Sequence, residues 1–158
     1  MKYISALLVV FSLLLVSCEG DPGPPGPPGL IAQSFERTVD FGPPFYEATL
    51  EIPLTIELFE SDMVLVYRFL GQIDGLDVWK ILPETVYIET GEEFQYNFEH
   101  NFDLVTLFID APATFNFNDL LPQERLNQTF RVVVIPTDLV FGNNIDITNF
   151  EEVAAFLQ

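Results

Sequence analysis

Few residues in this chain could carry chemistry. There is one cysteine, Cys18, and one histidine, His100. These single copies exclude an internal disulfide framework, a CxxC redox pair and a cysteine-based zinc site, and they disfavour a histidine-dependent metal or proton-relay centre. After Cys18 the serines are Ser34 and Ser61, and neither lies in a GxSxG motif. Phosphate-binding motifs of the GxGxxG and P-loop types are also missing from the sequence, so we predict a protein that is not an enzyme.

Acidic residues dominate the charged set, with 24 Asp and Glu against 6 Lys and Arg and a net charge of −18. Two of these carboxylates at glycosidase spacing would make a small hydrolase, which is the least favoured alternative. Glu47, Glu51, Glu57 and Glu89 instead occupy solvent-facing positions of their expected strands. The net charge argues against nucleic acid and anionic lipid as partners, because both would be repelled, and it suits cationic or calcium-bridged partners.

Three aspartates are weak candidates for calcium. Asp74 and Asp77 flank a Gly-containing turn, and Asp62 ends another turn. Calcium takes six to eight oxygen ligands from flexible loops, which such acidic turns can supply. No DxDxDG loop is present, so the sequence gives calcium no stronger support, and no other metal is expected.

The aromatic residues are 16 Phe, 5 Tyr and 1 Trp. Sugar-binding modules stack exposed Trp or Tyr rings on pyranose rings, whereas an excess of Phe is typical of core filling. Trp79 and Tyr67 are the speculative ligand residues of a glycan-binding alternative. Strand alternation places Trp79 with Ile81 and opposite Lys80, which favours burial of the indole.

The first seventeen residues have the features of a signal peptide. Lys2 precedes the apolar run from Ala6 to Val16, whose roughly 16 Å of helix is too short for a bilayer core of about 30 Å. The run ends in Leu15-Val16-Ser17-Cys18, which resembles the bacterial lipobox. This resemblance implies cleavage before Cys18, diacylglycerol on its sulfur and acylation of the new amine. Two or three acyl chains would anchor the protein stably in a membrane, and no other cofactor is expected.

The next segment, residues 18–32, is expected to be a spacer. Residues 20–29 read GDPGPPGPPG, with glycine at every third position: Gly20, Gly23, Gly26 and Gly29. Proline fixes φ and donates no hydrogen bond, so this stretch favours an extended polyproline II spacer of about 30 Å. The alternative is a short collagen-like stalk that trimerises the protein. Three triplets bury little surface and acidic chains repel each other, so we expect a monomer.

Two acidic residues, Glu19 and Asp21, follow the lipidation site directly. Cys18-Glu19-Gly20-Asp21 resembles the signal with which lipoproteins of Bacteroidota reach the outer face of the outer membrane. The resemblance implies an outer-membrane lipoprotein of the cell envelope that is displayed on the surface rather than in the periplasm.

Residues 33–158 show the period-two pattern of half-buried strands. Runs such as Tyr46–Ile52 alternate apolar and polar residues, while Met63–Tyr67 and Val132–Ile135 are apolar on both faces and predict central strands. We predict a mostly β domain, an antiparallel sandwich or open barrel of 8–9 strands, in which the runs on either side of Gly42-Pro43-Pro44 are neighbouring antiparallel strands. The nine candidate strands are Phe35–Phe41, Tyr46–Ile52, Leu54–Phe59, Met63–Tyr67, Val78–Leu82, Val86–Glu89, Glu92–Glu99, Val105–Ile109 and Val132–Ile135.

The end of the chain predicts one short helix. Thr148 and Glu151 fit a capping box, and Phe150, Val153 and Leu157 follow at helical spacing. We expect this helix to lie across one sheet or to plug one end of the fold.

The whole layout resembles small lipoproteins of Bacteroidota, especially marine Flavobacteriia, through the lipobox, the Gly-Pro-Pro triplets and a β-rich domain. Within the domain the segments Ser61–Tyr67, Val78–Pro83 and Phe130–Pro136 carry the resemblance. It brings no catalytic motif. We therefore expect a lipid-anchored envelope protein with a binding or structural role, whose protein or glycan partner is unknown.

Overall fold

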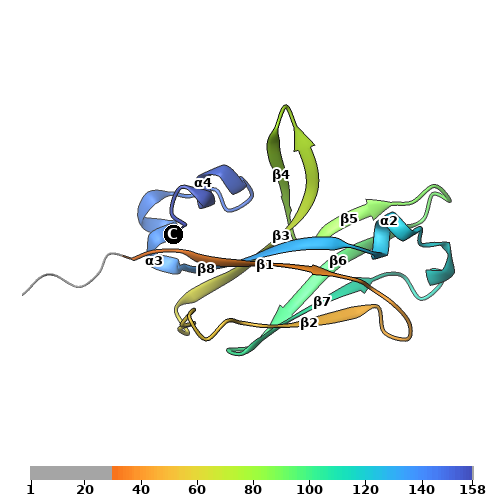
Figure 1. Cartoon of the computed structure of the whole chain (residues 1–158), viewed down its shortest axis with the longest axis horizontal. Coiled ribbons are helices and arrows are strands. Elements are labelled where there is room, and N and C mark those ends of the chain that lie inside the picture. The colour runs from red at the N-terminus through yellow and green to blue at the C-terminus, as the bar shows by residue number, and fades with distance from the viewer. Residues whose placement is uncertain (1–29, 158) are drawn as a thin grey trace, which may run out of the picture.

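The computed structural model describes residues 30–157 as two antiparallel sheets packed face to face (Figure 1). Residues 1–29 and 158 lie outside the described residues, and with them the predictions for the signal peptide, Cys18, Glu19, Asp21 and the spacer from Gly20 to Gly29. The mostly β, sandwich-like fold is confirmed. Its eight strands are β1 (Gln33–Val39), β2 (Glu47–Glu51), β3 (Asp62–Ile73), β4 (Leu76–Ile81), β5 (Glu84–Tyr87), β6 (Glu93–His100), β7 (Leu104–Asp110) and β8 (Gln128–Pro136).

Each sheet contains four strands, in the orders β1-β8-β3-β4 and β2-β7-β6-β5. All pairs of neighbouring strands are antiparallel. The segment between β7 and β8 forms two short helical turns, and two further helices follow β8. These are the 3-10 helix η2 (Phe117–Asp119) and the α-helices α2 (Pro122–Arg125), α3 (Thr137–Asn143) and α4 (Phe150–Ala154).

Strand β8 is buried on both faces, as its continuous apolar run predicts. Phe130, Val132 and Val134 point into the core between the two sheets, whereas Val133 and Ile135 point to a second core on the other side. Strand β3 alternates in the same way beside it. The prediction that these two strands are central and covered on both sides is confirmed.

Helices α3 and α4 form the cover over the outer face of the β1-β8-β3-β4 sheet (Figure 1). Leu139 of α3 and Val153 of α4 are buried against that face. The two ends of the domain meet here, because the Ala32 N–H donates to the Phe156 carbonyl at 3.1 Å. The expectation that the C-terminal helix lies across one sheet is therefore confirmed.

The start of α4 differs by one residue from the predicted capping box. Asn149, not Thr148, is the N-cap, and its side-chain oxygen accepts from the Glu151 N–H at 3.1 Å. Thr148 instead donates to Asp146 from both its hydroxyl and its backbone N–H, and these bonds hold the pKa of Asp146 below its usual value. Glu152 lies three residues after this N-cap, but its carboxylate accepts from the Asp146 N–H at 2.9 Å and from the Asn149 side-chain amide at 3.2 Å, so the reciprocal bond of a capping box is not formed.

The segment Leu54–Phe59 was predicted as a strand, and this prediction is wrong. It is the connection from β2 to β3, with a turn in which the Ile56 N–H donates to the Pro53 carbonyl at 2.8 Å. Its alternation has another cause: Ile56 and Leu58 pack against one end of the core while Leu54 is fully exposed.

The prediction that β1 and β2 are neighbours is also wrong. Strand β1 pairs with β8, and β2 pairs with β7 of the other sheet. The connection crosses between the sheets because Phe41 is buried in the core, where its N–H donates to the Arg125 carbonyl at 2.7 Å. The sequence also predicted a single helix, whereas α2 and α3 are present as well.

Among the described residues, no helix has both the length and the apolar character needed to cross a membrane.

We expect Phe130→Ala to lower the free energy of unfolding by about 3–5 kcal/mol, because it removes a fully buried ring. This ring meets Phe41 and Tyr96 edge to face, at 5.9 and 6.0 Å between centroids. Urea unfolding measures the effect. Phe141→Ala, at a ring that is 71% exposed on α3, is the control and should change stability by less than about 0.5 kcal/mol. Equal effects of the two substitutions would contradict this core.

Candidate functional site

The hairpin of β3 and β4 extends beyond the body of the sandwich (Figure 1). Strand β3 pairs with β8 only from Asp62 to Arg68, and its remaining residues pair with β4 alone. Asp74 and Gly75 close the hairpin with φ of 52° and 81°, a left-handed pair that glycine and aspartate tolerate. We call residues 69–79 the arm.

The arm carries large apolar side chains that face solvent. Leu70 is 47% exposed, Ile73 is 65% exposed and Leu76 is 67% exposed. Ile73 and Leu76 are also cross-strand partners. Exposed apolar side chains on a protruding element are typical of an interaction site, because a folded chain gains nothing from leaving them in water.

A groove of about 370 Å³ lies between the arm and the start of α4. Trp79 of the arm and Phe150 of α4 contribute the aromatic walls. Asp77 lies in the same groove, where its carboxylate accepts from the Gln72 amide at 2.7 Å, and Glu151 lines the helix side. The groove therefore combines aromatic, aliphatic and acidic side chains, within the size range of ligand pockets.

The indole of Trp79 is half-buried beneath a guanidinium group. The guanidinium carbon of Arg131 lies 4.1 Å from the Trp79 ring centroid and 4.7 Å from that of Phe150. Arg131 also pairs with the Glu36 carboxylate, with 2.7 Å between Nε and Oε1. The rings of Phe69 and Phe150 pack at 5.1 and 5.6 Å from the indole. The predicted parity is confirmed, since Trp79 and Ile81 pack on the helix-side cluster and Lys80 is exposed, but the indole is only partly buried.

Sequence reasoning did not single out Arg131 or Phe150 as part of this cluster. The sequence feature that could have indicated a role for Arg131 is its charge, because it lies directly between Phe130 and Val132 in an otherwise apolar run. Its parity places it on the helix side of β8 with Val133, which is where the Trp79 ring lies.

Tyr67 does not reach the groove, so its prediction as a ligand residue is wrong. The side chain is fully buried on the helix side of β3, and its hydroxyl donates to the Ile147 carbonyl at 2.6 Å. Burial raises the pKa of the phenol well above its ordinary value, and the nearby Asp146 carboxylate adds to the shift.

A polar cluster beside the arm connects the two sheets. The Arg68 guanidinium of β3 donates to both carboxylate oxygens of Glu84 on β5, at 2.7 and 3.0 Å, and so joins the two sheets. Arg68 also donates to Gln128 at 3.2 Å and lies 4.6 Å from the Tyr96 ring centroid. Gln128 donates in turn to two backbone carbonyls of the β7–β8 connection. All these groups are internally paired, so the cluster is a structural bridge.

The three calcium candidates are not brought together. Asp62 begins β3 and accepts from the Phe59 N–H at 3.0 Å, whereas Asp74 follows the end of the same strand. A strand of that length spans roughly 40 Å, so Asp62 cannot share an ion with Asp74 and Asp77. Within residues 30–157 no group of three or more His, Cys, Asp or Glu side chains is placed to hold a metal ion.

The other acidic and basic candidates lie apart from the groove. Glu47, Glu51, Glu57 and Glu89 are all exposed, as expected, although Glu57 and Glu89 lie in connections and not in strands. His100 ends β6 as an exposed residue, with its ring stacked on Phe98 at 6.4 Å.

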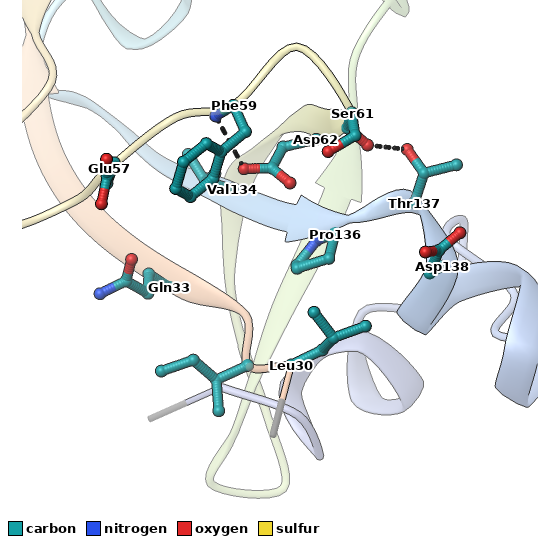
Figure 2. Close-up of a pocket in the computed structure, with 11 residues that line it drawn as sticks. Leu30, Gln33, Glu57, Phe59, Ser61, Asp62, Val134, Pro136, Thr137 and Asp138 are labelled. Atoms are coloured by element: carbon teal, nitrogen blue, oxygen red, sulfur yellow. Dashed lines mark hydrogen bonds between the residues drawn. The ribbon is translucent and has the colours of Figure 1, made fainter. Parts of the chain in front are cut away.

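A larger hollow of about 580 Å³ opens where the chain enters the domain (Figure 2). Leu30 and Phe59 contribute exposed apolar side chains, and Thr137 donates to the Ser61 carbonyl across one wall. Asp62 points into this hollow, and Asp138 lies at its rim (Figure 2). Val134 and Pro136 at the end of β8 also line it.

Comparison of the chain with protein-family models, with curated proteins and with solved structures found no match.

Because two buried phenols keep their protons in the folded state, we expect stability to fall at high pH. Burial raises the pKa of Tyr96 as well as that of Tyr67, whereas an unfolded tyrosine loses its proton near pH 10. The stabilising effect is therefore complete below about pH 10 and declines as the pH rises above it. In urea unfolding between pH 10 and 11.5, Tyr67→Phe should make the decline shallower by up to about 1.4 kcal/mol per pH unit.

Tyr87→Phe, at an exposed phenol of β5, is the matched control and should leave the slope unchanged. An unchanged slope in Tyr67→Phe would contradict the burial of that hydroxyl.

Proposed function

We propose that this chain is a non-catalytic binding module of the cell envelope, held at the outer membrane by acyl chains on Cys18, with the arm and its groove as the binding surface. The observation that carries the proposal is the arm itself. It extends beyond Arg68, the last β3 residue that pairs with β8, and exposes Leu70, Ile73 and Leu76, although burying such side chains is the main driving force of folding.

The described chain begins far from the arm. The chain enters the domain at Leu30, next to the start of β3, whereas the arm is the far end of β3. A lipid anchor on Cys18 and a spacer through Gly29 would thus leave the arm free to meet a partner, on the cell surface if Glu19 and Asp21 act as an export signal.

Glycan binding is the second candidate, because Trp79 lines the groove as a sugar platform would. The position of Arg131 argues against glycan binding. Its guanidinium carbon lies 4.1 Å from the centroid of the indole ring, so this face of the ring cannot stack on a pyranose.

We expect the anchor to be visible in the mature protein. Mass analysis of the N-terminus should find cleavage before Cys18 and acyl mass on this residue. Protease treatment of intact producing cells should remove the domain if it is displayed outside, whereas protection until lysis would place it in the periplasm. A mature chain without acyl mass on Cys18 would remove the tether from the proposal.

Site-specific photocrosslinking tests the binding surface. A photoreactive amino acid at Leu76 of the arm should give discrete crosslinked products on intact cells. The same group at Tyr87, which is 73% exposed on the other sheet, should give few. Equal products at both positions would indicate nonspecific contact, and products only at position 87 would move the binding surface to the other sheet.

A further inference from the structure

The charged side chains that line the groove beside the arm are all acidic. The side chains that line it include Asp74, Asp77 and Glu151 but no Lys or Arg. Arg131 lies against the groove rings, but its charge is already matched by Glu36. The groove therefore presents an unbalanced negative potential, which attracts a cationic ligand and repels an anionic one.

The same groove also requires an apolar ligand. Ile73 and Leu76 line it with about two thirds of their surface in solvent, and Val78 and Phe150 line it as partly buried side chains. A small inorganic cation would leave these side chains exposed. A ligand that carries both cationic and aliphatic groups would cover them and match the carboxylates.

The backbone of the arm favours an extended ligand. Strand β4 is the last strand of its sheet, and among the described residues β3 is its only strand partner. The outer edge of β4 therefore has backbone N–H and C=O groups that an added strand can pair with. In an extended peptide the side chains alternate between two faces, so one face can carry the basic groups and the other the aliphatic ones.

From this combination of edge strand, exposed aliphatic side chains and carboxylates, we infer that the groove binds a basic, extended peptide segment in which Lys or Arg alternates with aliphatic residues. The inference rests on the proposed function and names the chemistry of its partner. The carboxylates of Asp77 and Glu151 pair with the basic side chains, while Ile73 and Leu76 cover the aliphatic ones. A neutral glycan fits less well because Arg131 already covers the Trp79 ring.

The single tryptophan of the chain, Trp79, reports directly on the groove. The experiment uses the mature-length chain from residue 18 with Cys18→Ser, to which a capped hexapeptide of alternating Lys and Val is added. Trp79 fluorescence should change saturably at sub-millimolar peptide, and the affinity should fall as salt rises. A capped Glu-Val hexapeptide should give no change.

Variants separate the groove from general charge attraction. The double variant Asp77→Asn, Glu151→Gln should weaken Lys-Val binding about tenfold, since it removes two carboxylates at the contact. The matched control Glu93→Gln, Asp103→Asn also removes two negative charges, but at exposed sites of the other sheet and its β6–β7 turn. It should change the affinity by less than about twofold.

Three results would overturn the inference: equal binding of the two peptides, equal weakening by both double variants, or a response to a β-glucan hexasaccharide with none to the Lys-Val peptide. If crosslinks form at Leu76 while the Lys-Val peptide fails to bind, the binding surface stands and this partner chemistry is wrong.

Discussion

The fold depends on the need to bury both faces of two neighbouring strands. Strands β3 and β8 are apolar on both sides, and an uncovered face of either would expose a wide apolar surface. The second sheet covers one face, with Val132 and Val134 in the core between the sheets. The helices α3 and α4 cover the other face, over Val133 and Ile135. The crossing connection after β1 and the helices after β8 both follow from this requirement.

Much of this fold could be predicted from local alternation. Period-two runs and two continuous apolar runs predict segments that overlap all eight strands, and the Asp74-Gly75 pair predicts the turn of the arm. Alternation reports which face of a segment is apolar, but it does not tell what covers that face. For this reason Leu54–Phe59, whose apolar side chains pack on the end of the core from a loop, was mistaken for a strand. Strand pairing was also beyond local pattern, because β1 meets β8 about a hundred residues later.

The candidate site could be predicted only in its parts. Parity correctly indicated that Trp79 is turned toward a core, but the stack of Trp79, Arg131 and Phe150 joins three segments that are distant in sequence. Tyr67 was mistaken for a ligand residue because β3 looks equally apolar on both faces, and only the helix layer decides that this ring is enclosed. The arm is a tertiary property too: it exists because β3 is longer than the part of it that β8 pairs with.

The placement of the two ends of β3 has a mechanical consequence. If the domain is held by its N-terminus and bound through its arm, as proposed above, it is pulled in opposite directions along the strands. Tension would enter at Gln33 of β1, pass through β8 and leave at the far end of β3. In antiparallel sheets the hydrogen bonds lie perpendicular to the strands, so this geometry shears all the bonds of a ladder at once instead of opening them one by one. The β1-β8-β3-β4 sheet would thus resist stretching. A hairpin whose two strands are pulled apart from one end would instead lose its hydrogen bonds one after another.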